Sequence, residues 1–167
     1  TVTEALCLQP TQAPAQGSGK GIGVLVINYN TARQTLRCLE SIQQSTVLPD
    51  WVLVLDNASS ADDFQHLLKG CQPPEGGTLQ IYRSEKNLGF AQGSNVLIDL
   101  LLQQPACQHI MLLNNDAVAQ KDMLATLSAA LEAAGSGAGL AGGRMHKLAD
   151  PAEVDTLGIA MYASLMP

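Results

Sequence analysis

The sequence predicts a doubly wound α/β domain, in which a mainly parallel sheet is flanked by helices. Apolar runs alternate with helical patterns along the chain, and three runs, IGVLVI, WVLVL and IMLL, are apolar without interruption. Such runs are typical of strands that are buried on both faces of a parallel sheet, because helices cover both faces. The chain has 167 residues, of which 46% are hydrophobic and 14% charged, so it can bury a core of this kind.

Four strand and helix units are expected in series. The first strand covers residues 22–27 and precedes a helix over residues 31–44 with Leu36, Leu39 and Ile42 on one face. The other strands and helices are expected, in alternating order, at residues 51–55, 62–69, 79–82, 91–103, 110–113 and 121–134.

Three further local features are expected. Gly70 follows the second helix at the position where a left-handed cap costs little. The run at 79–82 alternates, which favours an edge strand. A last strand is expected at 159–165. Residues 1–20 are rich in Gln, Pro, Gly, Ser and Thr without a period, so we expect a disordered tail before a folded domain over 21–167.

Charge and composition exclude some partners and locations. Nine Lys and Arg stand against fifteen Asp and Glu, so the net charge of −6 offers no basic surface for nucleic acid. No apolar run reaches transmembrane length and no secretory leader pattern opens the chain, which predicts a cytoplasmic protein without a transmembrane segment. The cysteines are widely spaced, which predicts free thiols rather than a zinc site: Cys7, Cys38, Cys71 and Cys107.

Polar residues follow every predicted strand, where ligands bind in open α/β sheets. The segments are Asn28-Tyr29-Asn30, Asp56-Asn57, Lys86-Asn87-Leu88-Gly89-Phe90 and Asn114-Asn115-Asp116. Helix capping by Asn, Asp and Ser explains some of these positions. It explains less well two amides and a carboxylate directly after a fully apolar run, and hard divalent cations prefer such oxygen ligands.

Four segments together, VLVINYN, VLDNASSADD, SEKNLGFAQGSN and IMLLNNDA, resemble glycosyltransferase family 2, whose fold is of the Rossmann-like GT-A type. The resemblance covers about residues 22–120 in the correct order. It implies that Asn28, Tyr29 and Asn30 border the nucleotide and that Asp56 reads the base, with Asn57 holding its loop. A carboxylate is a charge-assisted acceptor for the imide N–H of uracil or thymine.

The other two segments of the resemblance imply the rest of the site. Residues 86–95 correspond to a second nucleotide-binding segment, in which Lys86, Asn87, Gly89 and Asn95 border the donor, Gly89 by allowing close backbone approach. Asn114-Asn115-Asp116 correspond to the metal motif D-x-D with Asn in the first place. Asp116 is then the ligand of Mg²⁺ or Mn²⁺, Asn114 offers its amide oxygen, and Asn115 lies on the donor side.

The resemblance implies an inverting glycosyltransferase of polysaccharide biosynthesis. It would move a sugar from a UDP- or dTDP-linked donor to a hydroxyl of a saccharide or lipid-linked saccharide, in the cytoplasm or at the cytosolic face of the membrane. No acidic residue after Asp116 matches the family's general base, so we expect a donor-binding part that is truncated before the acceptor-binding half. An apolar surface left exposed would then favour self-association.

Other functions are less well supported. The GSGKG segment precedes the first strand and lacks the Ser or Thr of a P-loop, and a dinucleotide-binding motif fails for the same reason of order. No G-x-S-x-G motif supports a hydrolase. A nucleotidyltransferase would carry a Gly-rich, Arg-containing loop where NYNTARQ stands. A catalytically silent module that binds a sugar nucleotide remains open as an alternative.

Overall fold

The computed structural model describes residues 1–8 and 19–156, which belong to two compact units, 1–124 and 125–167. The strand expected at residues 159–165, and residues 9–18 of the expected tail, lie outside the described residues. The first unit holds the main sheet and the residues of the predicted site.

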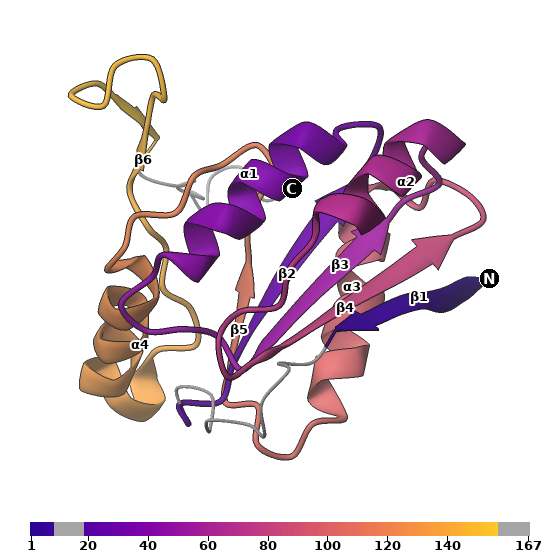
Figure 1. The fold of residues 1–167 in the computed structure, drawn as a ribbon. Helices are drawn as coiled ribbons and strands as arrows, with labels where there is room; N and C mark the ends of the chain where they lie inside the picture. Colours follow the sequence, from indigo (N-terminus) through magenta and orange to yellow (C-terminus); the bar gives the residue numbers. More distant parts are fainter. Residues whose placement is uncertain (9–18, 157–167) are drawn as a thin grey trace, which may run out of the picture. The chain divides into compact units, whose positions relative to one another are not determined.

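The first unit is built on a five-stranded sheet with the order β1-β4-β3-β2-β5 (Figure 1). Strands β2 to β5 are parallel to one another, and β1 pairs antiparallel with β4. The strands are β1 (Val2–Leu8), β2 (Ile22–Asn28), β3 (Trp51–Asp56), β4 (Thr78–Ser84) and β5 (His109–Leu112). The predicted doubly wound, mainly parallel sheet is therefore confirmed.

Strand β1 corrects two expectations. Residues 2–8 were expected in a disordered tail, but their backbone pairs with β4 from Val2 opposite Ser84 to Leu8 opposite Leu79. As a consequence β4, expected at the edge of the sheet, has a neighbour on each side. The physical reason is that an unpaired edge of N–H and C=O groups is a template for another strand, which composition alone does not reveal.

Helices cover both faces of the sheet (Figure 1). The helices of the first unit are α1 (Ala32–Gln43), α2 (Ala61–Gly70) and α3 (Gly89–Leu102). Their bounds, and those of α4 (Met123–Ala134), most of which belongs to the second unit, agree with the expected ones to within two residues. Gly70 is the last residue of α2 and not a left-handed cap, because its φ is not positive. It is small because a Cβ there would collide with Leu36 of α1. None of the described helices is both long and apolar enough to cross a membrane.

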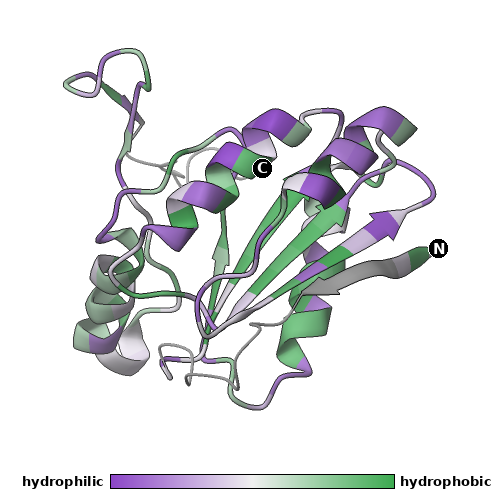
Figure 2. Cartoon of the chain, in the orientation of Figure 1, coloured by the Kyte–Doolittle hydropathy of each residue, from purple (hydrophilic) through white to green (hydrophobic). Residues whose placement is uncertain are grey.

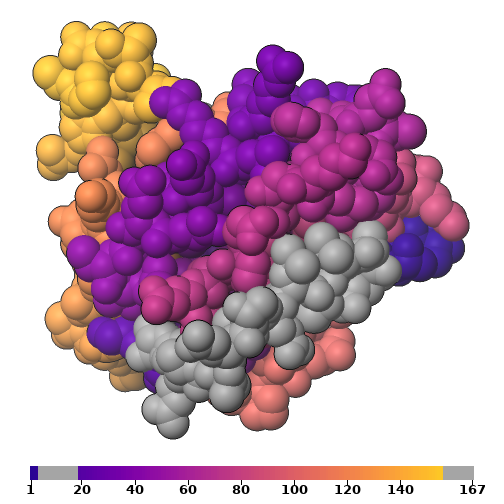
Figure 3. Space-filling model, viewed as in Figure 1, coloured from indigo at the N-terminus to yellow at the C-terminus, as the bar shows by residue number. Residues whose placement is uncertain are grey.

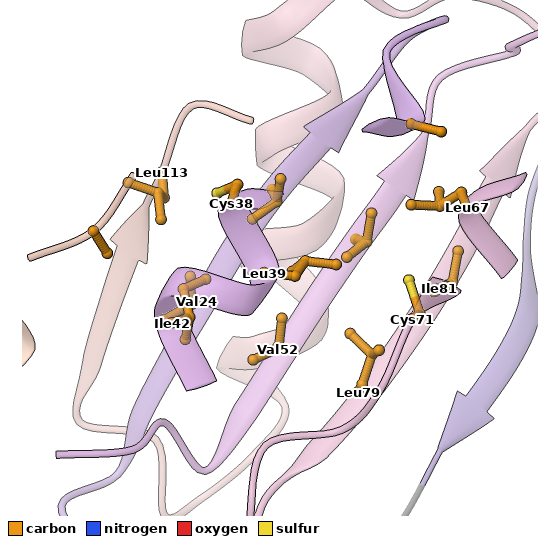
Figure 4. Packing of buried hydrophobic residues seen from close by; sticks show 14 of the residues in the cluster. Val24, Cys38, Leu39, Ile42, Val52, Leu67, Cys71, Leu79, Ile81 and Leu113 are labelled. Atoms are coloured by element: carbon orange, nitrogen blue, oxygen red, sulfur yellow. The ribbon is translucent and has the colours of Figure 1, made fainter. Parts of the chain in front are cut away.

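The core of the first unit lies in two layers, one on each face of the sheet. On one face Val24 and Val52 pack with Leu39 and Ile42 of α1 and Leu67 of α2 (Figure 4). On the other face a second cluster joins the sheet to α3 and contains Leu25, Leu53, Leu55, Leu97 and Leu101. Successive residues of one strand thus serve opposite layers, which is why the middle parts of β2 and β3 are continuously apolar and are drawn green in Figure 2.

The order of the strands reverses direction at β2. Helices α1 and α2 lead the chain from β2 to β3 and on to β4, whereas α3 leads it back to β5 on the other side of β2. In open α/β sheets ligands bind beyond the carboxyl ends of the strands at such a switch point. The fold therefore directs attention to the loops that follow β2 and β5.

The described part of the second unit contains most of α4, a short 3-10 turn (Gly135–Gly137) and a small antiparallel hairpin. The hairpin pairs β6 (Met145–His146) with β7 (Val154–Thr156). The sequence predicted neither of these two short strands, because two or three residues are too few to show a period.

Candidate functional site

The carboxyl ends of the parallel strands bring the predicted site segments to one edge of the sheet. Asn28 at the end of β2 pairs in register with Asp56 at the end of β3, and Asp56 pairs with Arg83 near the end of β4. Residues 113–116 continue from β5 on the other side of β2, where Leu113 N donates to Leu25 O at 3.0 Å. We call this edge, with the loops that follow these strands, the rim.

Asn28 is the centre of the rim and is fully buried. Its Nδ2 lies 3.0 Å from Asp56 Oδ1, 3.1 Å from Ser59 Oγ and 3.0 Å from Asp63 Oδ2. Its Oδ1 accepts a hydrogen bond of 2.7 Å from Thr35 Oγ1 on α1. Because the buried amide has partners at both ends, it fixes β3, α1 and α2 against the end of β2.

The loops after β2 and β3 hold each other through paired contacts. Asn30 N donates to Ser59 Oγ at 2.9 Å, and Ser60 N donates to Asn30 Oδ1 at 2.8 Å. Asn30 and Ala58 have positive φ angles of 55° and 65°. For Ala58 this conformation costs on the order of 1 kcal/mol, so the bonds of neighbouring residues must hold it. The site loops are thus rigid turns rather than open coil.

Asp63 lies in the first turn of its own helix, α2, and its side chain also reaches the start of α1. Its Oδ1 accepts from Ala32 N at 2.9 Å, so it caps the first turn of α1 from across the rim. Ser60 caps α2 instead, by accepting from Asp63 N at 3.3 Å. A carboxylate at a helix N-terminus is favourable because it meets unpaired N–H groups and the positive end of the dipole.

Asp56 is the residue expected to read the base, and in the structure its carboxylate is fully buried. Oδ1 accepts from Asn28, and Oδ2 has no hydrogen-bond partner among the residues that the structure describes. The nearest cation is Arg83, whose Nε lies 3.4 Å from Oδ2. Any ligand that is to reach Oδ2 must therefore move a neighbouring side chain. Because Oδ2 accepts no hydrogen bond within the described chain, it is free to accept one from that ligand.

Arg83 holds a defined position over this carboxylate. Its Nη2 donates to Ser59 O at 3.1 Å, and its guanidinium carbon lies 4.1 Å from the centre of the Phe64 ring. The side chain is 36% exposed, so part of the guanidinium faces solvent at the rim. No local pattern in the sequence singles out Arg83, because its partners lie on other elements.

The segment after β4 is joined to the rim through Asn57. Asn57 Nδ2 donates to Asn87 Oδ1 at 2.9 Å, and Asn57 Oδ1 accepts from Leu88 N at 2.8 Å. Asn57 therefore holds the neighbouring segment as well as its own loop. Gly89 has a φ of 72°, and a Cβ there would meet nothing within 4 Å, so the backbone conformation and not a close approach within the chain requires glycine.

Of the remaining predicted donor-side residues, Tyr29 and Lys86 lie on loops of the rim and Asn95 lies within α3. Tyr29, Lys86 and Asn95 are exposed, and Tyr29 retains 48% of its surface. Exposed polar and aromatic side chains beside a rigid rim are available to a ligand, in contrast to Asn28 and Asp56.

The segment after β5 forms a tight turn. Ala117 N donates to Asn114 O at 3.1 Å, which places Asn115 and Asp116 at the central positions. Cys38 Sγ on α1 also donates to Asn114 O, at 3.5 Å. Burial, together with the smaller effect of the negative charge of Asp116, raises the pKa of the Cys38 thiol to about 12. The thiol is therefore neutral, and the carboxylate of Asp116 acts on it electrostatically.

Asn115 connects this turn to the rest of the rim. Its Nδ2 donates to Thr31 Oγ1 at 2.6 Å and to Thr35 Oγ1 at 3.0 Å. Because Thr35 donates to Asn28, an unbroken chain of side-chain contacts runs from Arg83 through Asp56, Asn28 and Thr35 to Asn115. The segments expected on the base side and on the metal side are thus joined.

The oxygen atoms offered by this turn suit a hard cation that takes its other ligands from a substrate. Asp116 and Asn114 are exposed and Asn115 is partly exposed, so carboxylate and amide oxygens are available together. Among the side chains that the structure describes, no three His, Cys, Asp or Glu cluster as a metal cage would require. Magnesium is commonly held by one or two carboxylates together with substrate phosphates, which this turn could satisfy.

A hollow elsewhere on the first unit contains none of the predicted site residues. It measures about 430 Å³ and lies between α1 and α2, which are side by side on the face drawn in Figure 3. Its lining includes Arg33, Arg37, Glu40 and His66. The three cysteines of the described side chains, Cys38, Cys71 and Cys107, are free, as the sequence predicts.

Comparisons with known proteins agree with this architecture. The model of the family described as glycosyl transferase family 2 matches residues 23–150. The search of curated proteins finds no match. Among solved structures, S. aureus TarS 1-349 is 22% identical with a TM-score of 0.51, covering 65% of this chain and 31% of that one.

A second solved structure is similar to the same extent. The mannosyltransferase PcManGT from Pyrobaculum calidifontis, in complex with GDP-Man and Mn²⁺, is 20% identical with a TM-score of 0.54. The match covers 69% of this chain and 32% of that protein. The chain thus spans about a third of the length of these two solved structures, and the likeness shows the fold.

Proposed function

This chain belongs to glycosyl transferase family 2, and we propose that its rim binds the donor of a glycosyl transfer, a nucleoside diphosphate sugar, together with a divalent cation. The observation that carries the proposal is the chain of contacts from Arg83 to Asn115. It joins the two segments that the family resemblance assigns to base and metal, at the switch point where the fold favours a ligand.

On the base side, Oδ2 of Asp56, which contacts Arg83 Nε at 3.4 Å but accepts no hydrogen bond from the described residues, supports a role in recognition. A buried carboxylate oxygen without a donor is costly, and the imide N–H of uracil or thymine would satisfy it. We propose that Arg83, which is partly exposed, moves aside when the base enters. The exposed ring of Tyr29 offers a face on which a base can stack.

On the phosphate side, we propose that Asp116 holds Mg²⁺ or Mn²⁺ and that the diphosphate completes the coordination. The exposed carboxylate and the adjacent amides fit such a cation. When bound, the cation offsets the charge that develops on the departing nucleoside diphosphate. PcManGT, a structural neighbour, was solved with Mn²⁺ and GDP-Man, which is consistent with cation use.

We propose that the whole protein transfers the sugar with inversion to an acceptor hydroxyl, on a saccharide or a lipid-linked saccharide. A general base must then approach that hydroxyl within hydrogen-bond reach, and we assign no described residue to this role. The domain assignment, with residues 21–167 as the donor-binding part, is also a proposal. Polysaccharide biosynthesis, the cytoplasmic location and self-association remain predictions.

Isothermal titration calorimetry with UDP, dTDP and GDP tests the proposal. We expect UDP or dTDP to bind more tightly with MnCl₂ than without it, and Asp56→Asn to weaken both nucleotides. Asp62→Asn is the matched control, because Asp62 is an exposed carboxylate in the first turn of α2. If none of the three nucleotides binds with or without the cation, the proposed site is wrong.

A turnover assay with the same chain tests the assignment of the base. Acid–base help contributes about 10²- to 10⁴-fold to such reactions, so we expect little transfer by this chain alone. Binding without turnover is also what a catalytically silent module would show. Rapid transfer by the purified chain would show that the base lies within it.

A further inference from the structure

We propose that Thr35 is a positioning residue, which turns the Asn115 side chain so that its amide oxygen faces the divalent cation beside the carboxylate of Asp116. The inference rests on the proposed donor and cation site and adds two residues to it. The family resemblance placed Asn115 on the donor side and assigned the amide oxygen to Asn114, whereas the hydrogen bonds of the rim favour Asn115.

The direction of these hydrogen bonds is set at Asn28. Its amide nitrogen lies 3.0 Å from a carboxylate oxygen of Asp56 and 3.0 Å from one of Asp63. Ionised carboxylates only accept hydrogen bonds, so the end of the amide that faces them must be the NH₂ group. The carbonyl oxygen of Asn28 consequently faces Thr35 and needs a donor.

Thr35 supplies that donor, and its hydroxyl can then donate to no other group. Its hydroxyl has one proton, which goes to Asn28 Oδ1 at 2.7 Å, while Thr31 O lies farther away at 3.3 Å. Thr35 Oγ1 can then only accept from its other neighbour, Asn115, at 3.0 Å. A flipped Asn115 would set its carbonyl oxygen against an oxygen that has no proton to give.

Thr31 cannot make this choice, although it is closer to Asn115. Its Oγ1 lies 2.6 Å from Asn115 Nδ2, but the hydroxyl is partly exposed and its own bond to Tyr29 O is long, at 3.4 Å. A hydroxyl that is free to rotate accepts from an NH₂ group or donates to a carbonyl equally well. Only Thr35, buried and committed to Asn28, distinguishes the two orientations.

The orientation leaves one polar atom of Asn115 for a ligand. Both Nδ2 protons are used by the two threonines, and no residue in the described part of the chain donates to Oδ1. Asn115 and Asp116 are neighbours at the centre of the turn that Ala117 N closes on Asn114 O. An amide oxygen and a carboxylate offered by adjacent residues of one turn are ligand types that a hard cation prefers.

The first test reads the orientation without any ligand. In ¹⁵N NMR spectra, the side-chain NH₂ of Asn115, assigned by its loss in Asn115→Ala, should exchange with water more slowly than the amides of exposed asparagines. Thr35→Val should accelerate this exchange and Thr35→Ser, which keeps the hydroxyl, should restore it. Exchange in the wild type as fast as in an exposed asparagine would overturn the proposal.

The second test measures how much MnCl₂ strengthens UDP binding, as the ratio of the two dissociation constants. Loss of a residue that orients a metal ligand typically costs 10- to 100-fold in metal affinity. We therefore expect Thr35→Val and Asn115→Ala to lower the Mn²⁺ enhancement about 10-fold or more, with little change in binding without the cation. Thr35→Ser should behave like the wild type.

Ser41→Ala is the matched control. Ser41 is another buried hydroxyl of α1, and it accepts from Ala119 N at 2.9 Å near the same turn. If Ser41→Ala lowers the enhancement as much as Thr35→Val does, Thr35 has no specific role. If the wild type shows the enhancement and Asn115→Ala keeps it, the inference is wrong while the proposed function stands. If the wild type binds none of UDP, dTDP and GDP with Mn²⁺, the proposed function and the cation role of Asn115 both fail, and the exchange data still report its orientation.

Discussion

Replacement of Arg83 by Met should destabilise the chain, because it leaves the buried carboxylate of Asp56 without its neighbouring cation. The length of the side chain at position 83 changes little. Three contacts disappear with the guanidinium. These are the approach of Nε to Asp56 Oδ2 at 3.4 Å, the hydrogen bond to Ser59 O at 3.1 Å and the contact with the Phe64 ring at 4.1 Å. Asp56 is fully buried, so water does not take the place of the lost cation.

The expected magnitude follows from these contacts. The bond to Ser59 contributes about 1 kcal/mol and an unpaired buried oxygen costs about 1–3 kcal/mol, of which the lower part applies because Oδ2 already lacks a hydrogen bond. The ring contact, at a partly exposed side chain, adds about 0.5–1 kcal/mol. We expect a loss of about 3 kcal/mol in the free energy of unfolding, or roughly 10 °C in the melting temperature.

Urea unfolding followed by the fluorescence of Trp51, the one tryptophan of the sequence, measures this loss. A double-mutant cycle with Asp56→Asn isolates the charge, because an uncharged side chain at position 56 no longer needs the cation. Arg83→Met should cost clearly less in the Asp56→Asn background than in the wild type. A cost below about 1 kcal/mol, or an equal cost in both backgrounds, would refute the assignment of Arg83 as the partner of Asp56.

Three other predictions follow from individual side chains. Asp116→Asn should lower the Mn²⁺ enhancement of UDP affinity at least about 10-fold and leave binding without the cation unchanged; calorimetry that finds equal loss in both conditions would contradict this. Burial raises the pKa of Cys71 from 9.0 to about 12, so between these values the unfolded state releases the proton and the native state keeps it. Unfolding measured from pH 8 to 11 should therefore show stability falling above pH 9, by up to about 1.4 kcal/mol per pH unit from this thiol, and falling less in Cys71→Ala. Gly23→Ala should cost about 1–3 kcal/mol because its Cβ would collide with Leu101 Cδ1, whereas Gly89→Ala, with a φ of 72° and open space around it, should cost about 1 kcal/mol from backbone strain; a lower cost for Gly23→Ala than for Gly89→Ala in urea unfolding would contradict the packing explanation.

Local patterns were sufficient to predict most of the architecture. The apolar run of β2 packs against helices on both faces of the sheet. For this reason its residues do not alternate between apolar and polar, and the continuous run indicates burial on both faces. Polar residues at the strand ends were predicted for a similar reason, since parallel strands end at one edge. Strand β1 was missed because its pairing depends on the exposed edge of β4, about eighty residues away in the chain.

The residues that organise the rim were harder to foresee. Thr35 lies on the buried stripe of α1, where a polar residue is a weak signal that a polar partner is present. Arg83 and Asp63 carry no such signal, because each is defined by a partner on another element. Asp56 was identified from the motif, but its complete burial depends on how Arg83 and the neighbouring loops pack.

By itself the sequence determined the order of strands β2 to β5 and of helices α1 to α4, the two apolar faces of the sheet and the polar segments that gather at its carboxyl edge. These follow from periodicity and from residues adjacent in the chain. Only the tertiary structure decided which amides are buried, which way each one points and which oxygen is left for a ligand. Asn28 and Asn115 take their directions from Asp56, Asp63 and Thr35, because a hydrogen bond depends on a few tenths of an ångström between groups that the chain separates by up to 80 residues.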